Sequence, residues 1–124
     1  SAPPPFVAKI LPDVLRSYAR LIREGAVLVA GTDAGIGPAK PHGVLPYGLA
    51  QLVALGMSPA AALAAGTSTA AQVCGLGDRK GRVRPGYDAD LLAVDGDPLT
   101  DLGALLRPVA LLVGGRPVVT AALS

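Results

Sequence analysis

An unbroken apolar run lies between an amphipathic stretch and a loop rich in glycine and proline. The run, Ala26 to Ala30, is too short for a helix but has the composition of a strand buried on both faces of a parallel sheet. Gly31-Thr32-Asp33 follows it directly. Parallel α/β folds gather functional groups at the carboxyl ends of their strands. The run therefore predicts an α/β unit that presents Asp33 at the end of a strand.

Helical patterns flank this run on both sides. Upstream, apolar residues recur at helical spacing from Val7 to Ile22. Because proline is tolerated only near a helix start, the firm part of this helix is expected from about Pro12 to Glu24. Three further helices are expected downstream: over 46–55, after the capping pair Ser58-Pro59, and from Thr67 or Ser68 to Gly75 or Gly77.

The last third of the chain changes to strand and turn patterns. Short strands are expected at 81–83 and 90–95, with a type II turn at Pro85-Gly86 between them and a further turn at Asp97-Pro98. The segments 108–113 and 116–119 read as a β-hairpin joined by Gly114-Gly115. Helices thus dominate the middle of the chain and antiparallel strands its end.

Charge and cysteine content exclude several classes of function. The net charge of +2 and the absence of a long basic run argue against a nucleic-acid surface, and the cluster at 79–84 is expected to be a solvated turn. No apolar stretch approaches the roughly 20 residues that span a bilayer, and residues 1–5 do not resemble a signal peptide. The single Cys74 suits a reducing compartment, so a cytoplasmic location is expected.

Five motifs carry a resemblance to a known family. In order they are "VLVAGTDAG", "HG", "ALGMSPAAALAAGTSTAAQVCGL", "GRVRPGYDADLLAVDGDPLTDL" and "LLVGGRPV". In combination they resemble the C-terminal portion of a metal-dependent amidohydrolase, of the imidazolonepropionase-like or prolidase-like branch. The resemblance covers nearly the whole chain, from Pro12 to about Val119. Tyr87 departs from the lysine often found at its position, which is expected to be exposed.

The resemblance implies a specific fold. The family has a (β/α)₈ barrel and a small β-sandwich built from both chain ends. Residues 1–77 would then be the last part of the barrel, and residues 78–124 would be sandwich strands with the terminal hairpin. Val27 to Ala30 would be the eighth barrel strand, and the helix before it the seventh barrel helix.

The resemblance also implies a site and a reaction. Asp33 matches an aspartate that ligates a divalent metal, expected to be zinc, and shuttles a proton to the leaving amine. Thr32 would support that site with its hydroxyl. His42 matches none of the family's histidine metal ligands; from its place nine residues after Asp33 we expect either a contact with substrate, with Lys40 as a partner for a substrate carboxylate, or a surface-loop role, which is equally open. The implied reaction is hydrolysis of a C–N amide bond, not endoproteolysis, in a small cyclic amide or a dipeptide-like substrate.

The ligands that such a metal site needs are not in this chain. It has one histidine and no His-x-His pair, whereas a zinc site needs at least three protein ligands, and a complete barrel takes about 250 residues. Three explanations follow: a part of a longer enzyme or of a split one, a non-catalytic binding or assembly module, or a repacked small domain. We favour the first, in which the missing N-terminal portion or a complementing chain is the partner and the 124-residue chain alone is inactive.

Overall fold

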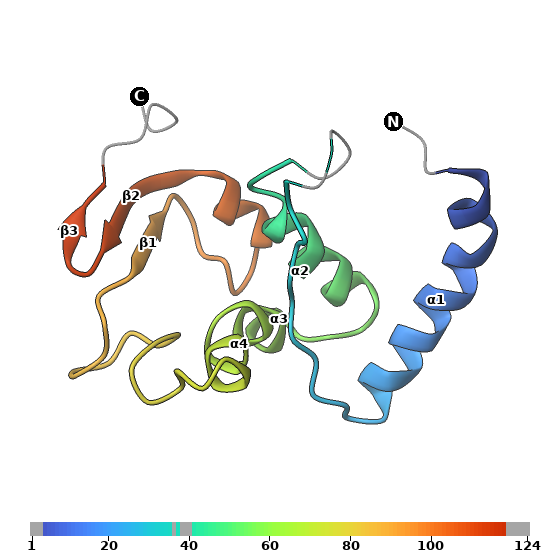
Figure 1. Ribbon diagram of the computed structural model, residues 1–124, viewed down its shortest axis with the longest axis horizontal. Helices are drawn as coiled ribbons and strands as arrows, with labels where there is room; N and C mark the ends of the chain where they lie inside the picture. The colour runs from blue at the N-terminus through green and yellow to red at the C-terminus, as the bar shows by residue number, and fades with distance from the viewer. Residues whose placement is uncertain (1–3, 36, 38–40, 119–124) are drawn as a thin grey trace.

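The computed structural model describes residues 4–35, 37 and 41–118. Helix α1 lies at one end of the molecule, three short helices lie in the middle, and a small sheet lies at the other end (Figure 1). The helices are α1 (Pro5–Arg23), α2 (Leu45–Ala54), α3 (Pro59–Gly66) and α4 (Ser68–Val73). Within the described ranges, no helix is long and apolar enough to cross a membrane.

The sheet is antiparallel and has the order β1-β2-β3. Its strands are β1 (Leu91–Val94), β2 (Pro108–Val113) and β3 (Arg116–Pro117), with a 3₁₀ helix, η1 (Leu102–Leu106), between the first two. The expected strand at 90–95 and the expected hairpin around Gly114-Gly115 are confirmed. The 3₁₀ helix was not expected; it begins where the Asp101 carboxylate accepts a hydrogen bond from the Gly103 amide at 2.8 Å.

The expected strand at 81–83 is wrong. This segment is a bend with no strand partner in the described chain, and Gly81 adopts a φ of +83°. A Cβ atom built on Gly81 would lie 2.7 Å from the carbonyl oxygen of Thr67 and 2.8 Å from Cα of Ser68. The segment therefore packs against the start of α4 instead of extending toward the sheet.

Helix α1 begins seven residues earlier than expected. Pro5 occupies the first turn, where a missing amide proton costs no hydrogen bond, and the helix continues through Pro12 in its interior. The expectation that Pro12 marks the helix start is therefore wrong; the interior proline removes one backbone hydrogen bond but does not end the helix. None of the residues of α1 is buried, so its apolar face remains uncovered in this chain.

The core lies between α2, α3 and η1. Leu49 of α2 is 3% exposed and packs with Ala62 of α3 and Leu102 of η1. The Ser58 hydroxyl caps α3 by accepting a hydrogen bond from the Ala61 amide at 3.2 Å, as the sequence predicted. This small cluster holds α2 in place, and with it the residues directly before Leu45.

The apolar run at 26–30 is not a strand in this structure. It passes alongside α3, with its last residue, Ala30, donating an amide hydrogen bond to the carbonyl oxygen of Ala65 at 3.0 Å. No strand of the described chain pairs with it, and Val27 is 79% exposed. A β-strand requires a neighbouring strand to pair with, and the described chain places none beside residues 26–30. Residues 26–30 therefore form no strand in the described chain, and their place as the eighth strand of a complete barrel stays a prediction.

Candidate functional site

Asp33 lies on a tight turn directly after the 26–30 run. It has a φ of +49°, which is in the left-handed region that non-glycine residues rarely adopt. The Ala34 amide donates a hydrogen bond to the Thr32 hydroxyl at 3.2 Å, which closes the turn beneath Asp33. Asp33 is exposed. The turn thus carries a carboxylate at the surface, in a backbone conformation that its neighbours must maintain.

The His42 imidazole lies over the same turn. A Cβ atom built on Gly35 would be 3.2 Å from Cε1 and 3.3 Å from Nε2 of His42. Gly35 and His42 are therefore in close contact, and His42 comes near the segment that carries Asp33. The sequence predicted both Asp33 and His42 as site residues. It gave no signal for Gly35, which is the residue that His42 contacts.

Two other predicted site residues have different outcomes. The Thr32 hydroxyl takes part in the turn by accepting a hydrogen bond from the Ala34 amide. Lys40 lies outside the described residues. The functional roles predicted for these residues, and for Asp33 and His42, stay predictions.

A groove of about 410 Å³ opens beside the turn. It lies between α1, residues 29–32 and α2, and apart from Thr32, Gln51 and Tyr18 its lining is aliphatic or glycine. Its lining residues are Val14, Leu15, Tyr18, Val29, Ala30, Gly31, Thr32, Val44, Leu45, Gly48, Gln51, Leu52 and Leu55. The groove therefore supplies apolar surface near the carboxylate and very few groups that could ligate a metal ion.

The described residues do not form a metal site by themselves. Asp33 and His42 are residue types that bind divalent ions, but no three His, Cys, Asp or Glu side chains of the described chain are grouped so that they could hold one. Positions outside the described ranges carry none of these four residue types. A metal ion at Asp33 would therefore need further ligands from outside this chain.

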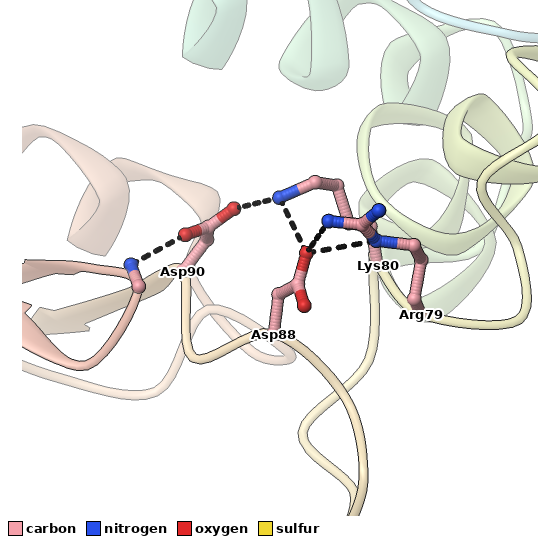
Figure 2. Close-up of polar contacts among 5 residues, drawn as sticks. Arg79, Lys80, Asp88 and Asp90 are labelled. Carbon is pink, nitrogen blue, oxygen red and sulfur yellow. Dashed lines mark hydrogen bonds and ion pairs between the residues drawn. The ribbon is translucent and has the colours of Figure 1, made fainter.

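A second polar cluster, not predicted to be a site, joins the end of α4 to the sheet. Figure 2 shows Asp88 between the Arg79 guanidinium and the Lys80 ammonium, with nitrogen–oxygen distances of 2.8 and 2.9 Å. Lys80 also lies 2.5 Å from the carboxylate of Asp90. Hydrogen bonds from Arg79 and then Lys80 hold the pKa of Asp88 below its ordinary value, and those from Lys80 and the Gly114 amide do the same for the pKa of Asp90.

This cluster adds one detail to the sequence analysis and corrects another. The basic segment at 79–84 is mostly exposed, as expected, but its first two cations are paired with carboxylates. Tyr87 is half-buried, and its hydroxyl donates a hydrogen bond to the carbonyl oxygen of Gly77 at 3.0 Å, whereas an exposed side chain was expected. Together these contacts attach β1 to the turn after α4, so we assign the cluster a structural role.

The known proteins that this chain resembles in sequence and structure are hydrolases, and they are much longer than this chain. The chain is 37% identical over 75 residues to an imidazolonepropionase of Rubrobacter xylanophilus, a match that covers 60% of the chain and 18% of that relative. A protein assigned as a prolidase in Bifidobacterium longum has a TM-score of 0.79 at 34% identity, with 86% of this chain and 26% of that one covered. A Xaa-Pro dipeptidase with bound methionine gives a TM-score of 0.83 at 26% identity, covering 94% of this chain and 28% of that one.

The matched part of the chain thus spans 18–28% of the length of these relatives. The corresponding parts of solved amidohydrolases have the same fold as this chain, which is α/β with a small sheet. The family model for the amidohydrolase family matches residues 5–118, which is almost the entire chain. The chain therefore belongs to the amidohydrolase family.

Proposed function

We propose that this chain is part of a metal-dependent hydrolase that cleaves C–N amide bonds in small cyclic amides or dipeptide-like substrates. Asp33 would be a metal ligand and the proton shuttle of the reaction. The cofactor would be a divalent ion, with zinc as the first choice. The chain alone would be inactive, and a cytoplasmic location, supported by the single Cys74, belongs to the same proposal.

One observation carries the proposal: an aspartate on a tight turn, after an apolar run, in a chain of the amidohydrolase family. The turn places Asp33 at the surface and at the carboxyl end of residues 26–30. The relatives named above comprise an imidazolonepropionase and a Xaa-Pro dipeptidase, and these names support a small C–N substrate.

The chemistry assigned to Asp33 follows from its side chain. A divalent ion, when bound, polarises a carbonyl and lowers the pKa of water to about 7. A carboxylate beside such a site can then take up a proton and return it to a leaving amine, a role that needs an ionisable group. An amide in place of the carboxylate retains the shape of the side chain but cannot carry the proton.

The remaining parts of the site would come from outside the chain. The described residues supply one carboxylate and one imidazole near the turn, fewer than the three ligands of a zinc site. Val27 and the apolar face of α1 are uncovered, as expected if strands and helices of the larger barrel pack there. The partner is thus proposed to be the rest of a longer polypeptide or a complementing chain.

The test begins with the polypeptide made in source cells, captured with an antibody against this chain. Intact-mass spectrometry should give about 40 kDa or more, as a full barrel with its sandwich requires, or this chain with a second one that is rich in histidine. The captured protein, supplied with zinc, should hydrolyse a cyclic amide such as imidazolonepropionate or a Xaa-Pro dipeptide.

The deciding variant is Asp33→Asn, with Asp95→Asn as an exposed and remote control. Asp33→Asn should lower turnover by about 100-fold or more while leaving assembly intact, because general acid–base catalysis contributes at least that factor. Near-normal turnover would exclude the shuttle role. A chain that is captured alone, folds and shows no hydrolysis on any of these substrates would instead support a non-catalytic binding or assembly module.

A further inference from the structure

The Asp33 turn combines two residues in the left-handed backbone region. Asp33 has a φ of +49° and Gly35 a φ of +91°. A non-glycine residue in this region costs about 1–2 kcal/mol, and such strain persists only where surrounding contacts fix the backbone. One such contact is the hydrogen bond from the Ala34 amide to the Thr32 hydroxyl. This bond spans the middle of the turn, and Gly35 lies at its far side.

The imidazole of His42 lies beside Gly35. Its Cε1 and Nε2 atoms lie where a side chain of residue 35 would begin, at 3.2 and 3.3 Å from the built Cβ position. These distances are shorter than an ordinary van der Waals contact, so a side chain at position 35 would require the imidazole to shift by a few tenths of an ångström. Glycine at 35 is favoured by its positive φ, and the neighbouring ring leaves little room for a Cβ atom.

His42 is itself tied to the core through the chain that follows it. Helix α2 begins at Leu45, and its Leu49 is buried against Ala62 and Leu102. His42 is exposed, so burial of the imidazole in a core does not explain its position. The contact with Gly35 thus links the Asp33 turn to an element that the core holds in place.

We propose that His42 is a positioning residue, which acts on Asp33 by packing its imidazole on Gly35. This differs from the substrate-contacting role expected from the sequence. The inference rests on the proposed function for the catalytic meaning of Asp33, whereas the packing itself stands on the contact alone. Its two parts can therefore be tested separately.

The first test is nuclear magnetic resonance of the 124-residue chain, which requires no activity. A cross-peak between the His42 Hε1 proton and the Gly35 α protons is expected. His42→Phe retains a planar ring and should leave the Ala34 amide as protected from hydrogen exchange as in the parent. His42→Ala removes the ring and should make that amide exchange faster. Absence of the cross-peak, or equal exchange in all three proteins, would overturn the packing.

A companion variant, Gly35→Ala, tests the contact from the other side. Its methyl group should displace the ring, so the resonances of the His42 ring protons should move toward the positions of an unpacked histidine. Gly25→Ala is the matched control, because Gly25 also has a positive φ, +78°, but has no atom within 4 Å of its built Cβ. Unchanged ring resonances in Gly35→Ala would contradict the inference.

The second test uses the active protein captured from source cells. A positioning role predicts that His42→Ala lowers kcat by about 100-fold with little change in KM, since misplacement of a catalytic group costs on this order, and that His42→Phe restores most of the loss. A substrate ligand would instead raise KM in both variants, which would overturn the positioning role. If Asp33→Asn were fully active while the cross-peak persists, the proposed function would fail and the packing would stand.

Discussion

The ammonium of Lys80 lies 2.5 Å from the carboxylate of Asp90, and the other oxygen of that carboxylate accepts the Gly114 amide at 2.8 Å. Asp90 therefore joins the turn after α4 to the loop of the β2–β3 hairpin, as Figure 2 shows for its two contacts. A single exposed side chain connects two segments that the sequence separates widely. The charge state of Asp90 should therefore affect the stability of the contact between the turn after α4 and the sheet.

The first prediction concerns Asp90→Asn, which retains an oxygen acceptor for Gly114 but removes the charge. The hydrogen bond from Lys80, with that from Gly114, lowers the pKa of Asp90 in the folded protein. A carboxyl with a lowered folded pKa stabilises the fold above its unfolded pKa, and this contribution is lost as the pH falls through the folded value. The free energy of unfolding should therefore be smaller in the variant at pH 7, with the difference disappearing in acid.

Urea unfolding from pH 2 to 7 checks this, with Asp95→Asn as the control. The side chain of Asp95 makes no hydrogen bond or ion pair within the described residues, so its variant should be about as stable as the parent at pH 7. The effect at Asp90 is expected to be small because the pair is solvent-exposed and screened by salt. A constant difference between parent and Asp90→Asn down to pH 2 would contradict the charge pairing.

The second prediction separates crowding from backbone strain at two glycines. Gly81 and Gly86 have nearly the same φ, +83° and +86°, but only the Cβ built on Gly81 meets fixed atoms, at 2.7 Å from the Thr67 oxygen and 2.9 Å from Cβ of Ala71. Gly86→Ala should lose about 1–2 kcal/mol of stability through strain. Gly81→Ala should lose about 1–3 kcal/mol more, because backbone atoms of α4 cannot easily move aside.

Chemical denaturation of the two variants side by side measures this difference. Equal losses of stability in Gly81→Ala and Gly86→Ala would show that crowding against α4 does not add to the backbone strain at Gly81. A larger loss for Gly81→Ala would also explain why the predicted strand at 81–83 does not form.

Local signals in the sequence were sufficient for several elements. The Ser58-Pro59 pair predicted the start of α3 correctly because the cap and the helix are adjacent in the chain. The hairpin around Gly114-Gly115 was predicted for the same reason, since a two-residue loop fixes the pairing of its flanking strands. In these places the chain specifies its structure within a few residues.

The errors occur where structure depends on distant or absent neighbours. The bend at Gly81 is set by its approach to α4, which no local pattern contains. The run at 26–30 has a strand composition but no strand beside it in the described chain. In the candidate site, the sequence predicted roles for Asp33 and His42, which stay predictions; it did not predict the contact of His42 with Gly35, because residue spacing carries no signal for such a contact.

The third prediction concerns the apolar face of α1. Phe6 of this helix is 71% exposed, and Val14 and Tyr18 line the groove beside residues 29–32. Contiguous apolar surface of this kind binds hydrophobic fluorescent dyes. The native 124-residue chain should therefore enhance dye fluorescence, and Val14→Asn should reduce the enhancement.

Val73→Asn is the matched control for this dye measurement. Val73 is 71% exposed on α4 but does not line the groove, so its replacement should leave the dye signal unchanged. Equal reductions in the two variants would mean that the dye does not report on the groove. No binding by the parent would mean that the face of α1 is covered in solution.

The last prediction concerns metal binding by the 124-residue chain alone. A zinc site needs at least three protein ligands, and the described residues group no three side chains of suitable type. After incubation with one equivalent of zinc and dialysis, the purified chain should retain far less than one ion per molecule by elemental analysis. Asp33→Asn should not change this weak retention, because one carboxylate without further ligands holds zinc poorly. Retention of one ion per chain that is lost in Asp33→Asn would show that this chain builds the site itself, and the proposal that other residues complete it would be wrong.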